Sequence, residues 1–250
     1  MKNRLDKLLF EHGLAPSRER AQALILAGRV LVNQQKVEKP GASVDDTALL
    51  RILGEEQRYV SRGGFKLEAA LDRWHIDLTG RRCADIGTST GGFTDCMLQH
   101  GAAGVVAVDT GYGQIAESLR RDPRVSLRER TNARYLKPGE LGPGISFVSM
   151  DVSFISATLV LPAVLAAVRE SSESRVEAVI LVKPQFEAGR EHVGKGGIVH
   201  DPAAHQLAIA RVREAVHDLG AAGSEVAESP IQGTKGNREF LLYSRFGAIA

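Results

Sequence analysis

A glycine-rich segment that follows a short apolar run constrains the fold of this chain more than any other feature. The segment ADIGTSTGGFTD spans residues 84–95, where the apolar run ends at Asp85 and Gly87, Gly91 and Gly92 follow. Glycines allow a flat, polar ligand to lie directly against backbone N–H groups at the start of a helix. We therefore expect a strand, a loop and a helix in this order, and we expect Asp85, Gly87, Ser89, Gly91 and Gly92 to bind a cofactor.

A second acidic residue indicates the kind of ligand. Asp109 closes the next apolar run, VVAVD, 24 positions after Asp85. In a doubly wound sheet, an acid at this strand end binds ribose hydroxyls. The glycine pattern differs from G-x-G-x-x-G, which disfavours a bound pyrophosphate and so an NAD-dependent oxidoreductase. A nucleoside without phosphates, such as S-adenosylmethionine, fits better. Asn132, in RTNAR, either contacts the adenine edge or makes a turn.

Apolar runs alternate with helical segments from residue 67 onward, which predicts an α/β fold with a parallel, doubly wound sheet. We expect strands at 82–86, 104–109, 125–128, 145–150 and 176–182, and helices through Trp74 and over 203–219. The last two strands, near 223–228 and 239–245, follow each other without a long helix between them. This arrangement predicts one antiparallel edge, as in Rossmann-like methyltransferases.

The N-terminal segment predicts a separate small domain over residues 1–60, with a larger domain over 61–250 and a polar linker at 54–66. Residues 1–66 carry 12 Lys and Arg against 8 Asp and Glu, although the whole chain has a net charge of only +2. Ser17 is a good N-cap for a short helix that Gly28 ends. Basic side chains on its polar face and in the linker suit RNA phosphates. The candidates are Arg4, Arg18, Arg20, Arg29, Arg58 and Arg62.

Composition excludes several classes of protein. No apolar run approaches the ~18 residues that a membrane span needs, and the charged N-terminus MKNRLDKLLF lacks the features of a secretory signal. Cys83 and Cys96 are the only cysteines, without a C-x-x-C pair or a clustered histidine. We therefore expect a cytoplasmic protein with reduced thiols, no metal site and no membrane partner.

Four charged residues occupy positions that suit a reactive site. Lys66 follows the SRGGF turn, Asp151 ends the strand ISFVSM, Lys183 ends the apolar run AVILV, and Glu239 opens the last strand. The carboxyl ends of parallel strands form the ligand crevice of an open α/β sheet. Two charges at neighbouring strand ends, beside a cofactor loop, therefore favour a functional site over surface decoration.

Two resemblances give these motifs a family context. RLDKLL, SRERAQALI and GRVLVN resemble the alpha-L RNA-binding module of a small-subunit ribosomal protein. The set RYVSRGGFKL, DIGTSTGGFTD, MDVSFIS, LVKPQFE and GNREFLL resembles the haemolysin-A-type (TlyA) ribosomal RNA 2′-O-ribose methyltransferases, which are relatives of FtsJ. That resemblance implies S-adenosylmethionine as cofactor, ribosomal RNA or a ribosomal subunit as partner, and a catalytic tetrad of Lys66, Asp151, Lys183 and Glu239. It also implies a cytidine target, and the chain resembles the shorter form that acts on the large subunit.

The chemistry of ribose methylation explains these residue types. A ribose hydroxyl is a poor nucleophile at neutral pH, so the reaction needs proton removal and alignment. Lys183 is the best candidate, either as general base or as electrostatic stabiliser of the alkoxide. Asp151 would orient Lys183, while Lys66 and Glu239 would position the ribose.

One further motif and two other functions compete with this interpretation. GREHVGK, residues 189–195, matches most of a phosphate-binding P-loop, but Gly196 replaces the Ser or Thr that binds Mg²⁺. We therefore expect a mobile lid or an RNA-contacting loop there. A ribosome-assembly factor with a vestigial methyltransferase fold is the alternative function, and a pore-forming haemolysin is disfavoured because a strongly amphipathic membrane helix is absent.

Overall fold

The computed structural model of the chain describes residues 2–53, 58–169, 175–233 and 236–247. It divides into two compact units, Met1–Arg58 and Tyr59–Ala250.

The N-terminal unit packs two helices against short strands. Its helices are α1 (Leu5–Glu11) and α2 (Arg18–Leu26), and its strands are β1 (Lys2–Arg4), β2 (Val30–Val32), β3 (Gln35–Lys36), β4 (Ser43–Asp45) and β5 (Leu50–Ile52). Ser17 caps α2 as expected, since its side chain accepts from the Arg20 N–H. Gly28, with φ +65°, follows the end of the helix. Leu5, Leu9 and Ile25 are fully buried and form the centre of this unit's core.

Its strands form two small sheets. β1 pairs with β4, and a second sheet has the order β3-β2-β5. All these pairings are antiparallel. The predicted strand after α2 is present, with bounds one residue shorter at each end than the segment Arg29–Asn33.

The C-terminal unit alternates strands and helices as the sequence predicts. Its strands are β6 (Arg82–Ile86), β7 (Gly104–Val108), β8 (Val125–Arg128), β9 (Ile145–Met150), β10 (Val176–Val182), β11 (Ala221–Glu228) and β12 (Phe240–Phe246). Its α-helices are α3 (Gly63–Trp74), α4 (Gly92–Gln99), α5 (Glu117–Arg120), α6 (Ala157–Arg169), α7 (Pro184–Glu187) and α8 (Pro202–Asp218). Three short 3₁₀ turns, η1 (Ala133–Tyr135), η2 (Arg190–His192) and η3 (Lys195–Gly197), complete it.

Helix α3 corrects the predicted linker. The linker was expected over 54–66, but the helix already begins at Gly63, so Lys66 lies in its first turn. Gly64 permits this early start, because a Cβ there would lie 2.3 Å from the ring of the buried Tyr59. Residues 54–57 of the predicted linker lie outside the described residues.

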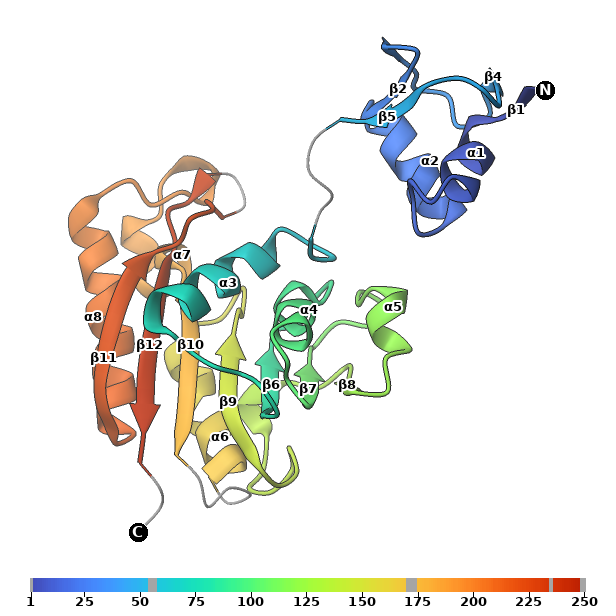
Figure 1. Cartoon of the computed structure of the whole chain (residues 1–250). Helices are drawn as coiled ribbons and strands as arrows, with labels where there is room; N and C mark the ends of the chain where they lie inside the picture. The colour runs from blue at the N-terminus through green and yellow to red at the C-terminus, as the bar shows by residue number, and fades with distance from the viewer. Residues whose placement is uncertain (1, 54–57, 170–174, 234–235, 248–250) are drawn as a thin grey trace. The chain divides into compact units, whose positions relative to one another are not determined.

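One seven-stranded sheet organises the C-terminal unit, in the order β11-β12-β10-β9-β6-β7-β8 (Figure 1). Strands β6 to β10 pair in parallel. β12 is antiparallel to both β10 and β11. The last two strands therefore form the predicted antiparallel edge, with β11 outermost.

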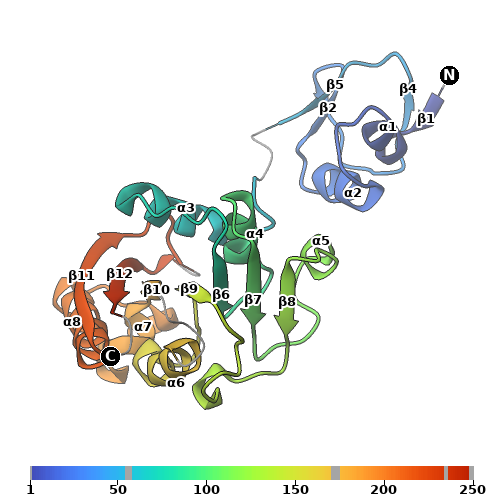
Figure 2. The same cartoon turned by 60° about the horizontal axis from the view of Figure 1, so that its bottom comes forward.

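Helices cover both faces of this sheet (Figures 1 and 2). Successive strand residues point to opposite faces of the sheet. Cys83 therefore packs in the core between the sheet and helices α3, α4 and α5, whereas Ala84 packs in the core on the other face, with α6 and α8. A strand buried on both faces is apolar throughout, as AVILV in β10 is. Because the strand interiors are apolar, polar side chains that could form a functional site lie at the ends of the strands.

Candidate active site

The four residues of the predicted tetrad meet at one edge of the sheet. Asp151 directly follows β9 and Lys183 directly follows β10. Glu239 stands one residue before β12 rather than inside it. Because β12 runs antiparallel to β10, with Phe240 opposite Val182, the start of β12 lies beside the end of β10. Lys66 reaches this edge from α3.

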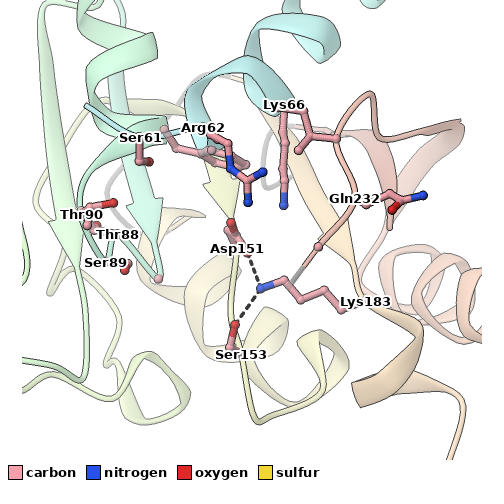
Figure 3. Close-up of a pocket in the computed structure, with 16 residues that line it drawn as sticks. Ser61, Arg62, Lys66, Thr88, Ser89, Thr90, Asp151, Ser153, Lys183 and Gln232 are labelled. Atoms are coloured by element: carbon pink, nitrogen blue, oxygen red, sulfur yellow. Dashed lines mark hydrogen bonds and ion pairs between the residues drawn. The ribbon is translucent and has the colours of Figure 1, made fainter. Parts of the chain in front are cut away.

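Two ion pairs join the four side chains. Lys66 Nζ lies 2.5 Å from Glu239 Oε2, and both side chains are buried. Lys183 Nζ lies 2.5 Å from Asp151 Oδ1. It also donates a hydrogen bond of 2.7 Å to Ser153 Oγ, as Figure 3 shows. Sequence reasoning missed Ser153, although it lies within the quoted motif MDVSFIS.

Three cavities open around these groups. Cavity A, of about 300 Å³, is lined by the glycine loop after β6 together with Arg62, Lys66, Asp151 and Lys183. Cavity B, of about 370 Å³, lies toward β7 and is lined by Asp109, Asn132 and the segment 151–155. Cavity C, of about 310 Å³, lies between Phe154, Phe186 and the segment 193–197, and Lys183 and Glu239 also line it.

The glycine loop lies against the loop that follows β9. Gly87 has φ +88°, and a Cβ on it would lie 2.5 Å from the Asp151 carbonyl oxygen. The Gly87 N–H donates to the Val108 carbonyl at 2.9 Å, which bends the chain between cavities A and B. Gly87 and Ser89 line both cavities, and Gly92 lines cavity A. Replacing Gly87 would therefore push the β6 and β9 loops apart.

Two predicted cofactor residues do not line a cavity. Asp85 is fully buried, and it accepts hydrogen bonds from Thr94 Oγ1 at 2.6 Å and Ser149 Oγ at 3.1 Å. Burial raises the pKa of Asp85 to about 6, although these hydrogen bonds oppose the shift. Gly91 packs toward Leu119 in α5. Both residues support the loop from the protein interior.

Asp109 lines cavity B and binds the loop backbone. Its two carboxylate oxygens accept from the Ser89 N–H at 2.7 Å and from the Gly111 N–H at 2.6 Å. Asn132 caps η1, since its side-chain oxygen accepts from the Arg134 N–H. It also lines cavity B, so the turn role is present and its amide still borders the cavity.

Cavity C contains a buried acceptor. Gln185 Oε1 has no hydrogen-bond partner in the part of the chain that the structure describes. Phe154 is 92% exposed, with φ +65°, and its ring centroid lies 5.6 Å from that of Phe186. An exposed and a half-buried aromatic ring beside an unpartnered polar group are typical of a ligand site.

The segment that resembles a P-loop, and the residues directly after it, border cavity C. Val193, Gly196 and Gly197 line the cavity, and the buried side chain of Asn237 binds the backbone that follows the segment. The Asn237 amide accepts from the Val199 N–H at 3.0 Å and donates to the Gly197 carbonyl at 2.9 Å. The residues after β10 thus border the tetrad, in a 3₁₀ turn instead of a P-loop helix.

Comparison with known proteins identifies the family of this unit. The FtsJ-like methyltransferase family matches residues 59–246. The chain belongs to this family. An S4 domain matches residues 3–48, in agreement with the RNA-binding module that the N-terminal motifs predict.

Named relatives of this FtsJ-like protein span nearly the whole chain. YqxC of Bacillus subtilis, named as a candidate rRNA methyltransferase, is 47% identical and covers 97% of this chain and 85% of its own length. The 16S/23S rRNA (cytidine-2′-O)-methyltransferase TlyA of Mycobacterium tuberculosis is 45% identical, over 97% of this chain and 89% of its own. Hemolysin A of Brachyspira hyodysenteriae is 39% identical, over 96% and 98%.

A more distant relative and a solved structure extend the comparison. The 23S rRNA (cytidine-2′-O)-methyltransferase TlyA of Campylobacter jejuni is 33% identical, over 74% of this chain and 70% of its own. A solved structure named as a candidate hemolysin from Streptococcus thermophilus has a TM-score of 0.73 and 43% identity, and covers 98% of this chain and 89% of its own.

The S4 domain holds most of the predicted RNA-binding arginines, but two of them are paired within it. Arg4 and Arg18 both bind Asp6, at 3.0 and 3.2 Å, and the Asp6 side chain is fully buried. The hydrogen bond from Arg4 holds the pKa of Asp6 below its ordinary value. Asp6 therefore fixes two arginines at the domain surface and offsets part of their charge.

The other candidates occupy different surroundings. The Arg20 side chain has no partner among the residues that the structure describes, whereas Arg29 Nε donates to the Leu53 carbonyl at 2.8 Å. Arg58 is exposed. Arg62 belongs to the FtsJ-like unit and lines cavity A, where its guanidinium points toward the space beside Lys66 (Figure 3).

The described residues show neither a metal cluster nor a membrane-spanning helix. They contain no group of three His, Cys, Asp or Glu side chains that could hold a metal ion. None of the helices among them is long and apolar enough to cross a membrane.

Proposed function

We propose that this protein transfers a methyl group from S-adenosylmethionine to the ribose 2′-hydroxyl of a cytidine in ribosomal RNA. The observation that carries the proposal is the position of Lys183. Its amine, paired with Asp151 and bonded to Ser153, borders cavities A and C. Ser153 also lines cavity B, so cofactor and target can meet at this group.

Cavity B has the chemistry that the adenosine part of the cofactor needs. Asp109 offers carboxylate oxygens for ribose hydroxyls, and Ile86, Val108 and Val160 supply apolar walls. Asn132 borders the same space and would contact the adenine edge. Gly87, Ser89 and Gly92 would hold the remainder of the cofactor along the loop shared with cavity A. When bound, the cofactor supplies an electrophilic methyl group on a sulfonium.

Lys183 carries the chemical step in this proposal. The Nζ group already donates a hydrogen bond, to Ser153, so it is presented as a donor toward an oxygen that gains negative charge. Donors fixed in advance stabilise such charge without reorganisation. We therefore assign Lys183 the role of stabilising the developing 2′-oxyanion, and Asp151 the role of holding the lysine in place. The hydroxyl proton would pass to solvent as the oxygen bonds to the methyl carbon and the bond from that carbon to sulfur breaks.

The remaining two tetrad residues would position the target nucleoside. Lys66 borders cavity A and Glu239 borders cavity C, and their ion pair joins the two. Cavity C suits a base, since Phe154 and Phe186 provide stacking surfaces. The unpartnered Gln185 Oε1 would accept from the exocyclic amino group that distinguishes cytosine from uracil.

Ribosomal RNA is the proposed partner because an S4 domain precedes the methyltransferase unit and the named relatives modify this RNA. The name of the Mycobacterium tuberculosis relative includes 16S and 23S rRNA, and that of the Campylobacter jejuni relative includes 23S rRNA alone. The 23S rRNA of the large subunit is therefore the substrate that the two names share. We accordingly propose a cytidine of the large subunit, and a cytoplasmic location, where ribosomes are assembled.

The test is methylation of purified large and small ribosomal subunits with isotopically labelled S-adenosylmethionine, followed by mapping of 2′-O-methyl groups. We expect label on a large-subunit cytidine. Single-turnover transfer should fall at least ~100-fold in Lys183→Ala, while cofactor affinity changes much less. Label on another base or on the small subunit alone would contradict the substrate. A Lys183→Ala protein that transfers at the normal rate would contradict the mechanism.

An assembly factor that does not depend on methylation is the competing function. Complementation of a deletion strain separates the two. If Lys183→Ala restores growth and ribosome profiles as the wild type does, the assembly role is favoured. If it fails although the protein is folded and abundant, transfer itself is required.

A further inference from the structure

A buried carboxylate outside the tetrad connects the two segments that carry Asp151 and Lys183. Glu187 ends α7, four residues after Lys183, and is only 5% exposed. Its Oε1 accepts from the Ala157 N–H at 2.6 Å, and its Oε2 accepts from Ser156 Oγ at 2.5 Å. These partners lie 30 and 31 positions earlier in the chain, at the start of α6.

The carboxylate supplies a cap for α6 from a different segment. The first N–H groups of a helix lack intrahelical partners, and a negative charge is favoured there. Ser156 Oγ accepts from the Thr158 N–H at 3.2 Å, while Glu187 takes the Ala157 N–H. No ion pair to Glu187 is formed within the described residues. Its Arg211 neighbour donates to the Glu187 backbone carbonyl instead. Burial raises the pKa of Glu187.

The segment that this cap anchors is the reactive loop. Residues 151–156 join β9 to α6 without regular structure and include Asp151, Ser153 and Phe154. The start of the loop is fixed by the hydrogen bond from the Asp151 N–H to the Ile86 carbonyl, at 2.9 Å. Its other end is fixed by Glu187. Lys183 and Glu187, which lie four residues apart, thus bind the two ends of one loop, Lys183 at Asp151 and Ser153 and Glu187 at Ser156.

We propose that Glu187 is a positioning residue for methyl transfer. It holds the 151–156 loop against the segment 183–187, so that Asp151 and Ser153 keep their places around Lys183 Nζ. This role rests on the proposed function and deepens it. A shift of about 1 Å at the reacting groups is enough to lower the rate of transfer ~100-fold, so the position of the 151–156 loop affects the rate directly.

The test compares four variants with one control, and the four are Glu187→Ala, Glu187→Gln, Ser156→Ala and the double variant of Ser156→Ala with Glu187→Ala. Glu187→Ala should lower single-turnover transfer about 10- to 100-fold. Glu187→Gln should recover most of the rate, because an amide can accept from the Ala157 N–H and donate to Ser156 Oγ. Ser156→Ala should cost less in the Glu187→Ala background than in the wild type, since the hydrogen bond between the two side chains is already lost there.

Asp201→Ala is the matched control. Asp201 also caps a helix with a carboxylate, since it accepts from the Ala203 N–H at 2.9 Å, and it lines none of the three cavities. Its loss should lower stability as cap loss does without lowering the transfer rate. Equal rate losses in Asp201→Ala and Glu187→Ala, or additive losses in the Ser156 and Glu187 double variant, would overturn the proposal.

Hydrogen exchange gives a readout that does not depend on activity. Amides of residues 151–158 should exchange faster in Glu187→Ala than in the wild type, and Asp201→Ala should leave them unchanged. Unchanged exchange in this segment would overturn the proposed anchoring role even if no RNA substrate were found. A wild-type protein that methylates neither subunit contradicts the proposed function only, so the two failures are distinguishable. If Glu187→Ala does not fold, Glu187→Asp, whose shorter side chain cannot span the same contact, replaces it in both measurements.

Discussion

Lys66 and Glu239 are 173 positions apart in the chain, and their side chains form a buried ion pair of 2.5 Å. The pair joins the first turn of α3 to the residue before β12, across the edge of the sheet where Asp151 and Lys183 lie. Removal of either side chain would leave the other charge buried without a partner, which strongly destabilises a folded protein. The tetrad is therefore a structural network as well as a candidate catalytic one.

The ion pair predicts a stability pattern. Lys66→Met and Glu239→Gln should each destabilise the protein by about 3–5 kcal/mol, because each leaves one buried charge without its partner. The double variant should be clearly more stable than the sum of the two losses implies. Urea unfolding of the three variants measures this. Additive losses would show that the two residues do not stabilise each other.

Asp109 predicts a loss of cofactor affinity. Asp109→Ala should weaken S-adenosylmethionine binding by ~1–3 kcal/mol, since charge-assisted hydrogen bonds to the ribose are lost. Calorimetry measures the affinity. Asp77→Ala is the control, because Asp77 also accepts from a turn N–H, that of Thr79, and lines none of the three cavities. Unchanged affinity in Asp109→Ala would remove Asp109 from the cofactor site.

Asp85 predicts a pH dependence of stability. Burial raises its pKa in the folded protein to about 6, from an ordinary value of 3.8. Between these values the folded state binds more protons than the unfolded state, so stability contributed by this group falls as the pH rises, and the loss is complete above about pH 6. Each pKa unit corresponds to about 1.4 kcal/mol.

Asp85→Asn tests this sign, since the amide stays neutral throughout. Relative to the wild type, the variant should gain stability between about pH 4 and pH 6 and show a constant difference above that range. Denaturant unfolding at several pH values measures the difference. A gain in the opposite direction, with the wild type favoured as the pH rises, would contradict a raised pKa at Asp85.

The S4 domain predicts different roles for its arginines. RNA affinity should fall linearly with salt on a log–log plot, with a slope of about −0.7 to −0.9 per phosphate contact. Arg20→Gln should reduce the slope by about one contact and leave folding unaffected, since its side chain has no partner among the described residues. Arg18→Gln should also lower stability, because Arg18 binds the buried Asp6. An unchanged slope in Arg20→Gln would exclude a phosphate contact at this position.

The sequence by itself determined the order of the elements and the identity of the charged residues at strand ends. Apolar runs predicted β6 to β10 because a strand buried on both faces must be apolar throughout. The glycines at 87 and 92 predicted the bend between β6 and α4, since the close approach to neighbouring backbone excludes a side chain. Asp151 and Lys183 were expected together because parallel strands end at one edge of the sheet.

Only the tertiary structure decided how these residues pair. Lys66 binds Glu239 because β12 inserts antiparallel beside β10, a pairing that local sequence does not encode. Asp85 faces the core, Arg4 and Arg18 share Asp6, and Glu187 caps a helix 30 residues away. Periodicity and turn signals extend over a few neighbouring residues, whereas such contacts depend on which distant segments packing brings together.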